Sequence, residues 1–300
     1  MHVLLTGGTG LIGRSLSASL LADGCRVSVL SRRPAEVAGL CGAKARGIAT
    51  LAELNDDPPD AVVNLAGAPI ADRRWTGERK ALLWSSRVTL TEQLVAWIGS
   101  LARKPAVLVS GSAVGWYGDT GDMPVDESHP ARSGFTHTLC DAWETAAQRA
   151  AAHGVRVCHV RTGLVVAPNG GFLQKMLLPF RLGLGGPIGK GRQYMPWVHV
   201  HDEVGIIRHL LTGEQCRGPY NATAPQPVSN REFARTLGHV LNRPALLPLP
   251  APALKLGLGE MAQLLLGGQN AVPRKVLESG YNFRFTELEP ALRDVLDSPH

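Results

Sequence analysis

The sequence has no apolar run long enough to cross a membrane and no closely spaced pair of cysteines. A membrane-spanning helix needs about 20 apolar residues, whereas the mostly apolar residues 1–5 are followed at once by Thr6-Gly7-Gly8. The five cysteines are odd in number and form no Cys-x-x-Cys motif, which excludes a disulfide framework and a structural zinc site. We therefore expect a cytoplasmic protein with reduced thiols, no bound metal and no membrane contact.

Blocks of like charge are absent as well. The 31 Lys and Arg residues exceed the 25 Asp and Glu residues by only six. This mild basic excess is not typical of a nucleic-acid-binding arm, and it leaves a small, anionic molecule as the expected partner. Glycine, in contrast, is abundant, with 34 residues that often stand in short clusters. Such clusters allow the backbone to come close to another group.

Short β-branched runs alternate with helical patterns in the first half of the chain. Strands are expected at residues 2–6, 26–30, 61–65, 106–110 and 155–160, and a long helix from about Thr76 to Leu101. This alternation predicts an α/β fold with a doubly wound parallel sheet, the Rossmann architecture. We place this domain at residues 1–168 and a smaller, mixed α/β C-terminal substrate domain, partly interleaved with it, at residues 169–300.

The second domain is expected to hold two helices, followed by short helices and one strand-like segment within residues 253–296. The helices are predicted at residues 202–211 and 229–241, and the strand at Tyr281–Phe285. Asp202 is the predicted N-cap of the first of these helices, since Asp is a favoured capping residue. The sequence leaves open whether the protein forms a homodimer.

The strongest motif is the glycine-rich segment at residues 6–13, which follows the first expected strand and opens a helix. Glycines in this position allow a tight turn and close approach of the backbone to a pyrophosphate, which the positive end of the helix attracts. The segment therefore predicts a dinucleotide site. Its expected cofactor-binding residues are Gly7, Thr9, Gly10, Leu11, Ile12 and Gly13.

The residues after the second expected strand indicate which dinucleotide is bound. An NAD site usually has an acidic residue here, which binds the ribose hydroxyls. This sequence has Ser31, Arg32 and Arg33 instead. Guanidinium groups beside a hydroxyl suit a 2′-phosphate, so we expect NADP(H), with NAD(H) as the less favoured cofactor. The alternative is that Arg32 and Arg33 are solvated surface charges.

Several further motifs carry a family resemblance that covers essentially the whole chain. They include Asn64-Leu65-Ala66-Gly67, Ser110-Gly111-Ser112, Ser86-Arg87, Arg161-Thr162-Gly163 and Trp197-Val198-His199. With these motifs the chain resembles the extended short-chain dehydrogenase/reductase superfamily. Within it, the chain is more similar to an atypical NAD(P)-binding epimerase family, whose members look like nucleotide-sugar epimerases followed by a C-terminal domain of unknown function.

The resemblance implies a role for individual residues. Ser112 matches the superfamily's catalytic serine, whose hydroxyl can hydrogen-bond a substrate carbonyl or alcohol. The alternative for Ser112 is a serine that caps its own turn. The further residues that the resemblance places at the cofactor are Leu65, Ala66, Gly67, Ser110, Gly111 and Gly163.

The chain departs from the superfamily pattern at one important point. Members normally carry Tyr-x-x-x-Lys on the next helix, and Thr136 and Cys140 stand there instead. Neither can act as a phenolate base or as its lysine partner. Tyr117, on a glycine-flanked loop, is our first candidate for a substitute proton donor, and a packing aromatic is the alternative reading of it.

Residues for the substrate are expected in the second domain. The segment from Arg181 to Gln193 combines five glycines with cationic side chains, so it could form a mobile cover over an anionic substrate. The expected substrate-binding residues are Lys190, Gln193, Trp197 and His199.

Two hypotheses of function follow. The first is an NADP(H)-dependent oxidoreductase or epimerase that acts on a small carbonyl or hydroxyl compound, with a nucleotide sugar as one candidate. The second is a catalytically inactive NADP(H)-binding sensor or scaffold. The missing Tyr and Lys favour the second hypothesis, and Ser112 with the glycine-rich loop favours the first.

Overall fold

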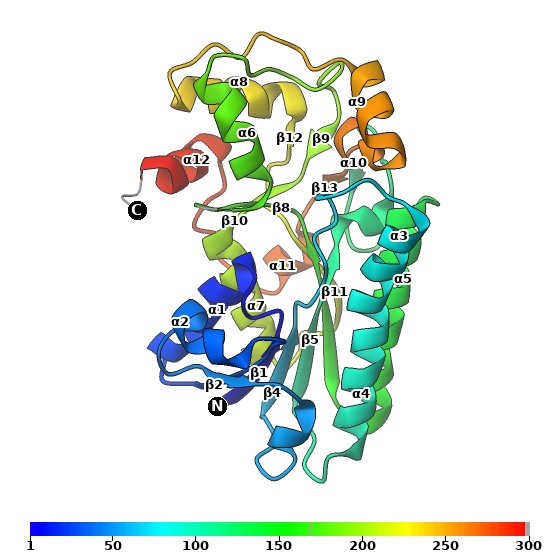
Figure 1. Ribbon diagram of the computed structural model, residues 1–300, viewed down its shortest axis with the longest axis vertical. Helices are drawn as coiled ribbons and strands as arrows, with labels where there is room; N and C mark the ends of the chain where they lie inside the picture. The colour runs from blue at the N-terminus through cyan, green and yellow to red at the C-terminus, as the bar shows by residue number, and fades with distance from the viewer. Residues whose placement is uncertain (169, 298–300) are drawn as a thin grey trace.

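The computed structural model describes residues 1–168 and 170–297, and its centre is a seven-stranded sheet (Figure 1). Neighbouring strands are parallel and follow the order β11-β7-β5-β4-β1-β2-β3. Because the order runs outwards from β1 in both directions, this is the doubly wound sheet that the sequence predicts. Its strands are β1 (His2–Thr6), β2 (Arg26–Leu30), β3 (Arg46–Ile48), β4 (Ala61–Asn64), β5 (Val107–Ala113), β7 (Arg156–Thr162) and β11 (Gly218–Ala222).

Helices cover both faces of the sheet (Figure 1). One face carries α1 (Leu11–Ala22), α2 (Val37–Cys41) and α7 (Val200–Thr212), and the other carries α4 (Leu90–Ser100) and α5 (Phe135–Gln148). Successive side chains of a strand point to opposite faces. Val3 and Leu5 accordingly join one core and Leu4 joins the other. Burial on both faces explains why these strands are almost continuously apolar.

The long helix expected from Thr76 to Leu101 is divided into three parts. They are α3 (Gly77–Trp84), a π-helical turn η3 (Ser85–Thr89) and α4. The hydroxyl of Thr76 caps α3 by accepting a hydrogen bond from the N–H of Arg79 at 3.1 Å. A π-turn is a local widening of the helix that is common at functional sites.

Most of the other helices and strands form the upper part of the molecule in Figure 1, above the carboxyl edge of the sheet. A second, smaller group of elements connects this upper part to the sheet. The upper part contains α6 (Gly171–Arg181), α8 (Asn230–Val240), α9 (Ala251–Leu258), α10 (Gln263–Leu266), α12 (Leu288–Asp297), β8 (Leu164–Val166), β9 (Tyr194–Met195), β10 (Trp197–His199) and β12 (Val228–Ser229). The connection contains β6 (Pro124–Val125), β13 (Asn270–Ala271) and α11 (Arg274–Glu278).

The two halves of the chain exchange elements. From the second half, strand β11 completes the central sheet and helix α7 packs on one of its faces, and β13 pairs with β6 from the first half. The upper part has its own apolar core, which includes Trp197, Phe233 and Leu292. The division at residues 168 and 169 stays a prediction.

Two local expectations are wrong, and both errors involve Asp202. The segment Tyr281–Phe285 is not a strand, because its backbone N–H groups at Arg284 and Phe285 bind the Asp202 carboxylate at 2.8 and 2.9 Å instead of a neighbouring strand. Asp202 is therefore not the N-cap of α7. That cap is His199, whose Nδ1 accepts a hydrogen bond from the N–H of His201 at 3.1 Å.

Candidate functional site

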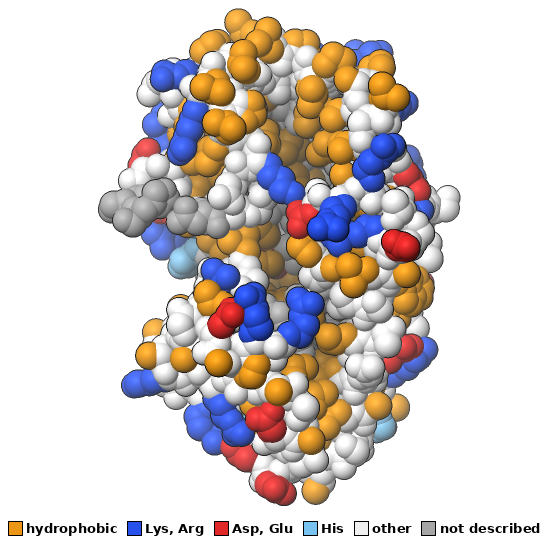
Figure 2. All heavy atoms as spheres, viewed as in Figure 1, with side chains coloured by type: hydrophobic (Ala, Val, Ile, Leu, Met, Phe, Trp, Pro, Cys, Tyr) orange, Lys and Arg blue, Asp and Glu red, His pale blue; other side chains and the backbone are white. Residues whose placement is uncertain are grey.

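A hollow separates the upper part of the molecule from the sheet (Figure 2). Hydrophobic side chains line it, and Lys and Arg side chains stand along its border. The carboxyl ends of β1, β4 and β5 meet at the edge of the sheet below the upper part (Figure 1). Ligands of open α/β sheets bind outside the carboxyl ends of the strands, near the point where the strand order reverses.

The glycine-rich loop is closed tightly by its own backbone. The N–H of Gly10 donates to the carbonyl of Gly7 at 3.0 Å, and Gly7 has φ +68°. A Cβ on Gly7 would lie 2.5 Å from the carbonyl oxygen of Leu65, and one on Gly13 would collide with the backbone of Gly7 and Gly8. Glycine is thus required at both positions.

The start of α1 is open to an anion. Gly10 is its N-cap, and no side chain caps the helix. The first backbone N–H groups of a helix have no partner within the helix. Thr9, Leu11 and Ile12 are only partly buried here, so the predicted pyrophosphate position is accessible.

The two arginines after β2 differ in their surroundings. Arg33 is exposed and forms an ion pair with Glu36 at 3.1 Å, and its N–H binds the hydroxyl of Ser31. Arg32 is exposed and has no hydrogen bond or ion pair to any other residue in the described part of the chain. Arg32 is therefore the guanidinium that is free to meet a phosphate.

A buried hydrogen-bond network fixes the loop after β4. The Asn64 side chain accepts from Thr6 at 2.6 Å and donates to Thr91 at 2.7 Å and to Ser110 at 3.3 Å. Thr6 also accepts a hydrogen bond from the N–H of Ala66. The network ties β1, β4, β5 and α4 together, so Leu65, Ala66 and Gly67 lie directly beside the glycine-rich loop. Ser110, predicted at the nicotinamide, has a fully buried hydroxyl in this network.

Ser112 lies near the end of β5 and donates a hydrogen bond of 2.6 Å to Oε1 of Glu144, on α5. Arg161, on β7, holds this carboxylate with two hydrogen bonds, from Nε to Oε1 at 2.8 Å and from Nη2 to Oε2 at 2.9 Å. Arg161 is 3% exposed. Ser112 is thus oriented by a buried, bidentate ion pair.

Sequence reasoning did not assign Glu144 and Arg161 to the site. Arg161 follows an apolar strand in the sequence that is expected to be buried, and this could have indicated an ion pair, because a buried charge requires a partner. The partner itself could not be identified from the sequence, since Glu144 is 17 residues away on another element.

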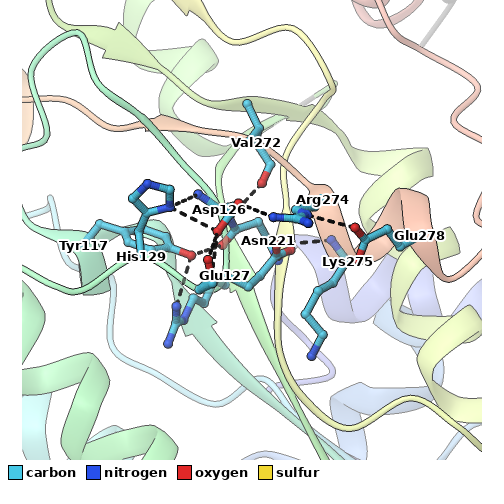
Figure 3. Close-up of polar contacts among 11 residues, drawn as sticks. Tyr117, Asp126, Glu127, His129, Asn221, Val272, Arg274, Lys275 and Glu278 are labelled. Carbon is cyan, nitrogen blue, oxygen red and sulfur yellow. Dashed lines mark hydrogen bonds and ion pairs between the residues drawn. The ribbon is translucent and has the colours of Figure 1, made fainter.

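Tyr117 lies at the end of a 3₁₀ turn, η4 (Val114–Tyr117), and is fully buried. Its hydroxyl donates to Oδ1 of Asn221 at 2.8 Å and accepts from Nη1 of Arg161 at 3.0 Å (Figure 3). Burial raises the pKa of Tyr117 to about 12. Tyr117 as proton donor stays a prediction, and this placement does not favour it.

The surroundings of Tyr117 connect three segments of the chain (Figure 3). One carboxylate oxygen of Glu127 accepts from the N–H of Asn221 at 2.8 Å, and the other accepts from the N–H of Lys275 at 3.2 Å. The Asn221 side chain donates to the carbonyl of Val272 at 2.9 Å. These contacts fasten β11 and α11 to the loop after β6.

Thr136 and Cys140, which the sequence comparison with the superfamily pattern places where Tyr and Lys are expected, lie on α5. Thr136 packs against Gly115, where a Cβ would lie 3.2 Å from the Thr136 Cβ. Cys140 is buried, and this burial raises the pKa of its thiol to about 12. A neutral thiol cannot supply the positive charge of a lysine. Helix α5 instead provides Glu144.

The predicted substrate residues Trp197 and His199 lie on β10, in the upper part of the molecule, and their role stays a prediction. Trp197 is fully buried in the core of the upper part, and its indole N–H donates to the carbonyl of Gln226. His199 is 3.3 Å from Asp294 of α12 and packs on Phe285, and burial lowers its pKa to about 4.

The loop that carries the other two substrate residues is held by hydrogen bonds. Gln193 donates to the carbonyls of Ile188 and Leu265, and Lys190 is exposed. Gly163, which was assigned to the cofactor, lies where β8 begins, and a Cβ there would collide with the carbonyl of Pro196.

No group of three or more His, Cys, Asp or Glu residues that could hold a metal ion occurs in the described part of the chain. Across residues 1–168 and 170–297, no helix combines the length and the apolar character that crossing a bilayer requires.

Comparisons with known proteins place the chain among its relatives. The model of the NAD dependent epimerase/dehydratase family matches residues 3–222, and a domain of unknown function, DUF1731, matches residues 249–295. Epimerase family protein Mb2239 of Mycobacterium bovis is 41% identical over 97% of this chain and 96% of its own length.

Two solved structures are also similar. The human epimerase family protein SDR39U1 (isoform 2), crystallised with NADPH, is 36% identical, with a TM-score of 0.89 over 100% of both chains. A nucleoside-diphosphate sugar epimerase from Corynebacterium glutamicum is 28% identical, with a TM-score of 0.78 over 99% of this chain and 58% of its own.

Proposed function

The chain belongs to the NAD dependent epimerase/dehydratase family, and from this premise we propose that it is an NADP(H)-dependent oxidoreductase or epimerase acting on a small carbonyl or hydroxyl compound. The observation that carries the proposal is the hydrogen bond from Ser112 to Glu144, next to the loops that suit a dinucleotide. A serine hydroxyl held by a buried carboxylate can take part in proton transfer.

The glycine-rich loop and Arg32 fit NADP(H). Gly7 and Gly13 leave the backbone clear of side chains, and the open start of α1 offers N–H groups to the pyrophosphate. Arg32 has no competing partner among the described residues. The human relative crystallised with NADPH supports this choice of cofactor. When bound, the nicotinamide ring supplies or accepts the hydride.

Ser112 and Glu144 would then carry the proton. When an alcohol is oxidised, Oγ of Ser112 accepts the proton of the substrate hydroxyl while its own proton passes to Oε1 of Glu144. Reduction of a carbonyl uses the same path in reverse. Arg161 holds the carboxylate toward Ser112 throughout, so it is a positioning residue. This arrangement would replace the missing Tyr and Lys.

The substrate that we favour is a nucleotide sugar. The nucleoside-diphosphate sugar epimerase that shares this fold supports that choice. Arg181, Lys190 and Arg192 are exposed on or beside the loop that precedes β9, where they could attract a diphosphate.

The test is consumption of NADPH with a panel of carbonyl compounds and nucleotide sugars. Ser112→Ala should lower turnover by about 10²–10⁴-fold and leave NADPH affinity unchanged. Ser100→Ala, at the exposed end of α4, is the matched control and should behave as the wild type. An unchanged rate in Ser112→Ala would remove Ser112 from the mechanism.

Cofactor choice is tested separately by titration with NADPH and NADH. Arg32→Ala should weaken NADPH binding and leave NADH binding unchanged, whereas Arg33→Ala should have the smaller effect because Arg33 is paired with Glu36. Equal losses for both cofactors would contradict the assignment of Arg32 to the 2′-phosphate.

A catalytically inactive NADP(H)-binding sensor or scaffold is the second candidate. The observation that favours it is Cys140, a buried neutral thiol where a lysine is normal in the superfamily. Tight binding of NADPH without turnover of any compound in the panel would support this function over the first.

A further inference from the structure

Arg87 occupies the π-helical turn η3 between α3 and α4, directly beneath the loop after β4. A Cβ on Gly67 would lie 2.8 Å from Cζ of the Arg87 guanidinium and 3.0 Å from its Nη2 atom. The neighbouring Ser86 hydroxyl accepts a hydrogen bond of 3.0 Å from the N–H of Ala68. The turn therefore fixes Arg87 against the same loop that borders the predicted cofactor site.

The guanidinium is partly buried and has no acidic partner in the described part of the chain. Within residues 1–168 and 170–297, no carboxylate lies within ion-pair distance of it. Its one hydrogen bond runs from Nη1 to the carbonyl of Leu83 at 3.4 Å. Nε and Nη2 have no acceptor in the same part of the chain. Burial lowers the pKa of Arg87, and the positive charge of Arg79 lowers it further.

The Arg87 guanidinium is also close to Ser112. It lies 5.4 Å from the ring centroid of Trp143, and this ring packs against Gly111, where a Cβ would lie 2.9 Å from it. Arg87 and Ser112 both lie near enough to the Cys140 thiol to influence its pKa. The guanidinium and the proposed catalytic hydroxyl therefore both lie in the neighbourhood of the Cys140 thiol.

A partly buried cation without an acidic partner lowers stability, because the hydration that it loses is not compensated by an opposite charge. Arg161, a short distance away, shows how this chain satisfies such a group when it serves the fold: with a bidentate carboxylate. The free N–H groups of Arg87 match the planar oxygens of a carboxylate or the oxygens of a phosphate.

We propose that Arg87 binds an oxyanion group of the substrate, a carboxylate or a phosphate, in the cleft beside Ser112. This inference rests on the proposed function, because it takes the cleft to be the substrate site. It makes the substrate an anionic carbonyl or hydroxyl compound whose charged group lies close to its reacting carbon.

The test measures binding of oxalate and of inorganic phosphate to the NADPH-saturated protein, by calorimetry at constant ionic strength with chloride as the reference. Oxalate represents a carboxylate, so the two probes separate the two sources of the oxyanion. We expect one of them to bind the wild type and Arg87→Met to weaken it by at least about 10-fold. Arg87→Lys, which keeps the charge but loses the planar fork, should fall between them.

Arg235→Met is the matched control, since Arg235 is exposed on α8. It should bind the probe as the wild type does. Without a probe, Arg87→Met should melt no lower than the wild type, because it removes a partly buried charge that no carboxylate compensates. A merely structural arginine would instead lower the melting temperature when replaced. If Arg87→Met does not fold, Arg87→Lys carries the test.

The proposal is overturned if neither oxalate nor phosphate binds the wild type, or if the Arg87 variants bind as well as the wild type does. A loss of NADPH affinity in Arg87→Met would also overturn it, because the guanidinium would then serve the cofactor. None of these measurements needs turnover. A negative result for anion binding can therefore be distinguished from a negative result for the proposed catalytic function, which NADPH consumption tests.

Discussion

Two buried glutamates lie on opposite faces of the sheet near the end of β7, and they differ in their partners. Arg161 and Thr162 are consecutive on β7 and point to opposite faces of the sheet. On one face Arg161 holds Glu144 in a bidentate ion pair. On the other face Glu203 of α7 is fully buried and accepts one hydrogen bond of 2.7 Å from Thr162. Its Oε2 has no partner within residues 1–168 and 170–297.

The difference shows what a partner does for a buried carboxyl group. The Arg161 guanidinium compensates the charge of Glu144, and the pair can therefore orient Ser112. Burial without a cation instead raises the pKa of Glu203 to about 8, so this group is protonated at neutral pH. The first face is equipped for proton transfer next to the cleft. On the second face the Glu203 carboxyl is neutral.

The largest effect is expected from breaking the ion pair. Glu144→Gln leaves the Arg161 guanidinium buried without an opposite charge, so the free energy of unfolding should fall by about 3–5 kcal/mol. Urea unfolding measures this change. Glu92→Gln is the control, because the Glu92–Arg149 pair is exposed, and it should change stability by less than about 1 kcal/mol. An equal fall in the free energy of unfolding of the two variants would show that the buried ion pair contributes no more to stability than the exposed one.

Glu203→Gln should raise the free energy of unfolding instead of lowering it, and this gain should grow as pH rises. Below about pH 4.3 this carboxyl is protonated in both states. Between there and about pH 8 it ionises only in the unfolded chain, which then binds fewer protons, so wild-type stability should fall by up to about 1.4 kcal/mol per pH unit. Glu203→Gln should remove this contribution and be the more stable protein at pH 8.

Urea unfolding at pH 6 and pH 8 measures this difference. Glu232→Gln, an exposed change in the first turn of α8, should keep the pH dependence of the wild type. A Glu203→Gln profile parallel to the wild type would mean that Glu203 ionises in the folded protein much as it does in the unfolded chain.

A smaller effect is expected beside the paired face. Tyr117→Phe removes the hydroxyl that binds Asn221 and Arg161, so the free energy of unfolding should fall by about 1–2 kcal/mol. Tyr194→Phe is the matched control, because the Tyr194 hydroxyl has no hydrogen bond in the part of the chain that the structure describes.

The kinetics of Tyr117→Phe also separate its two roles. Loss of turnover out of proportion to the loss of stability would restore Tyr117 as a candidate proton donor. Normal turnover in the folded variant would leave it a positioning residue for Arg161.

The sequence by itself determined the features that depend on neighbouring residues. Alternating apolar runs predicted the doubly wound sheet, and the spacing of Gly7, Gly10 and Gly13 predicted a tight turn at the start of a helix. The same local reasoning failed at Tyr281–Phe285, which has the composition of a strand. Its N–H groups are bound by Asp202 from a distant part of the chain.

Only the tertiary structure decided how the charged groups are paired. Glu144 and Glu203 both lie on helices. The residues next to them in the sequence do not predict that Glu144 pairs with a guanidinium and that Glu203 binds a hydroxyl. The same holds for Arg161, which is paired, and Arg87, which is not. Backbone geometry is set by the residues of one turn or strand, whereas the state of a buried charge depends on what the fold places within a few ångströms of it.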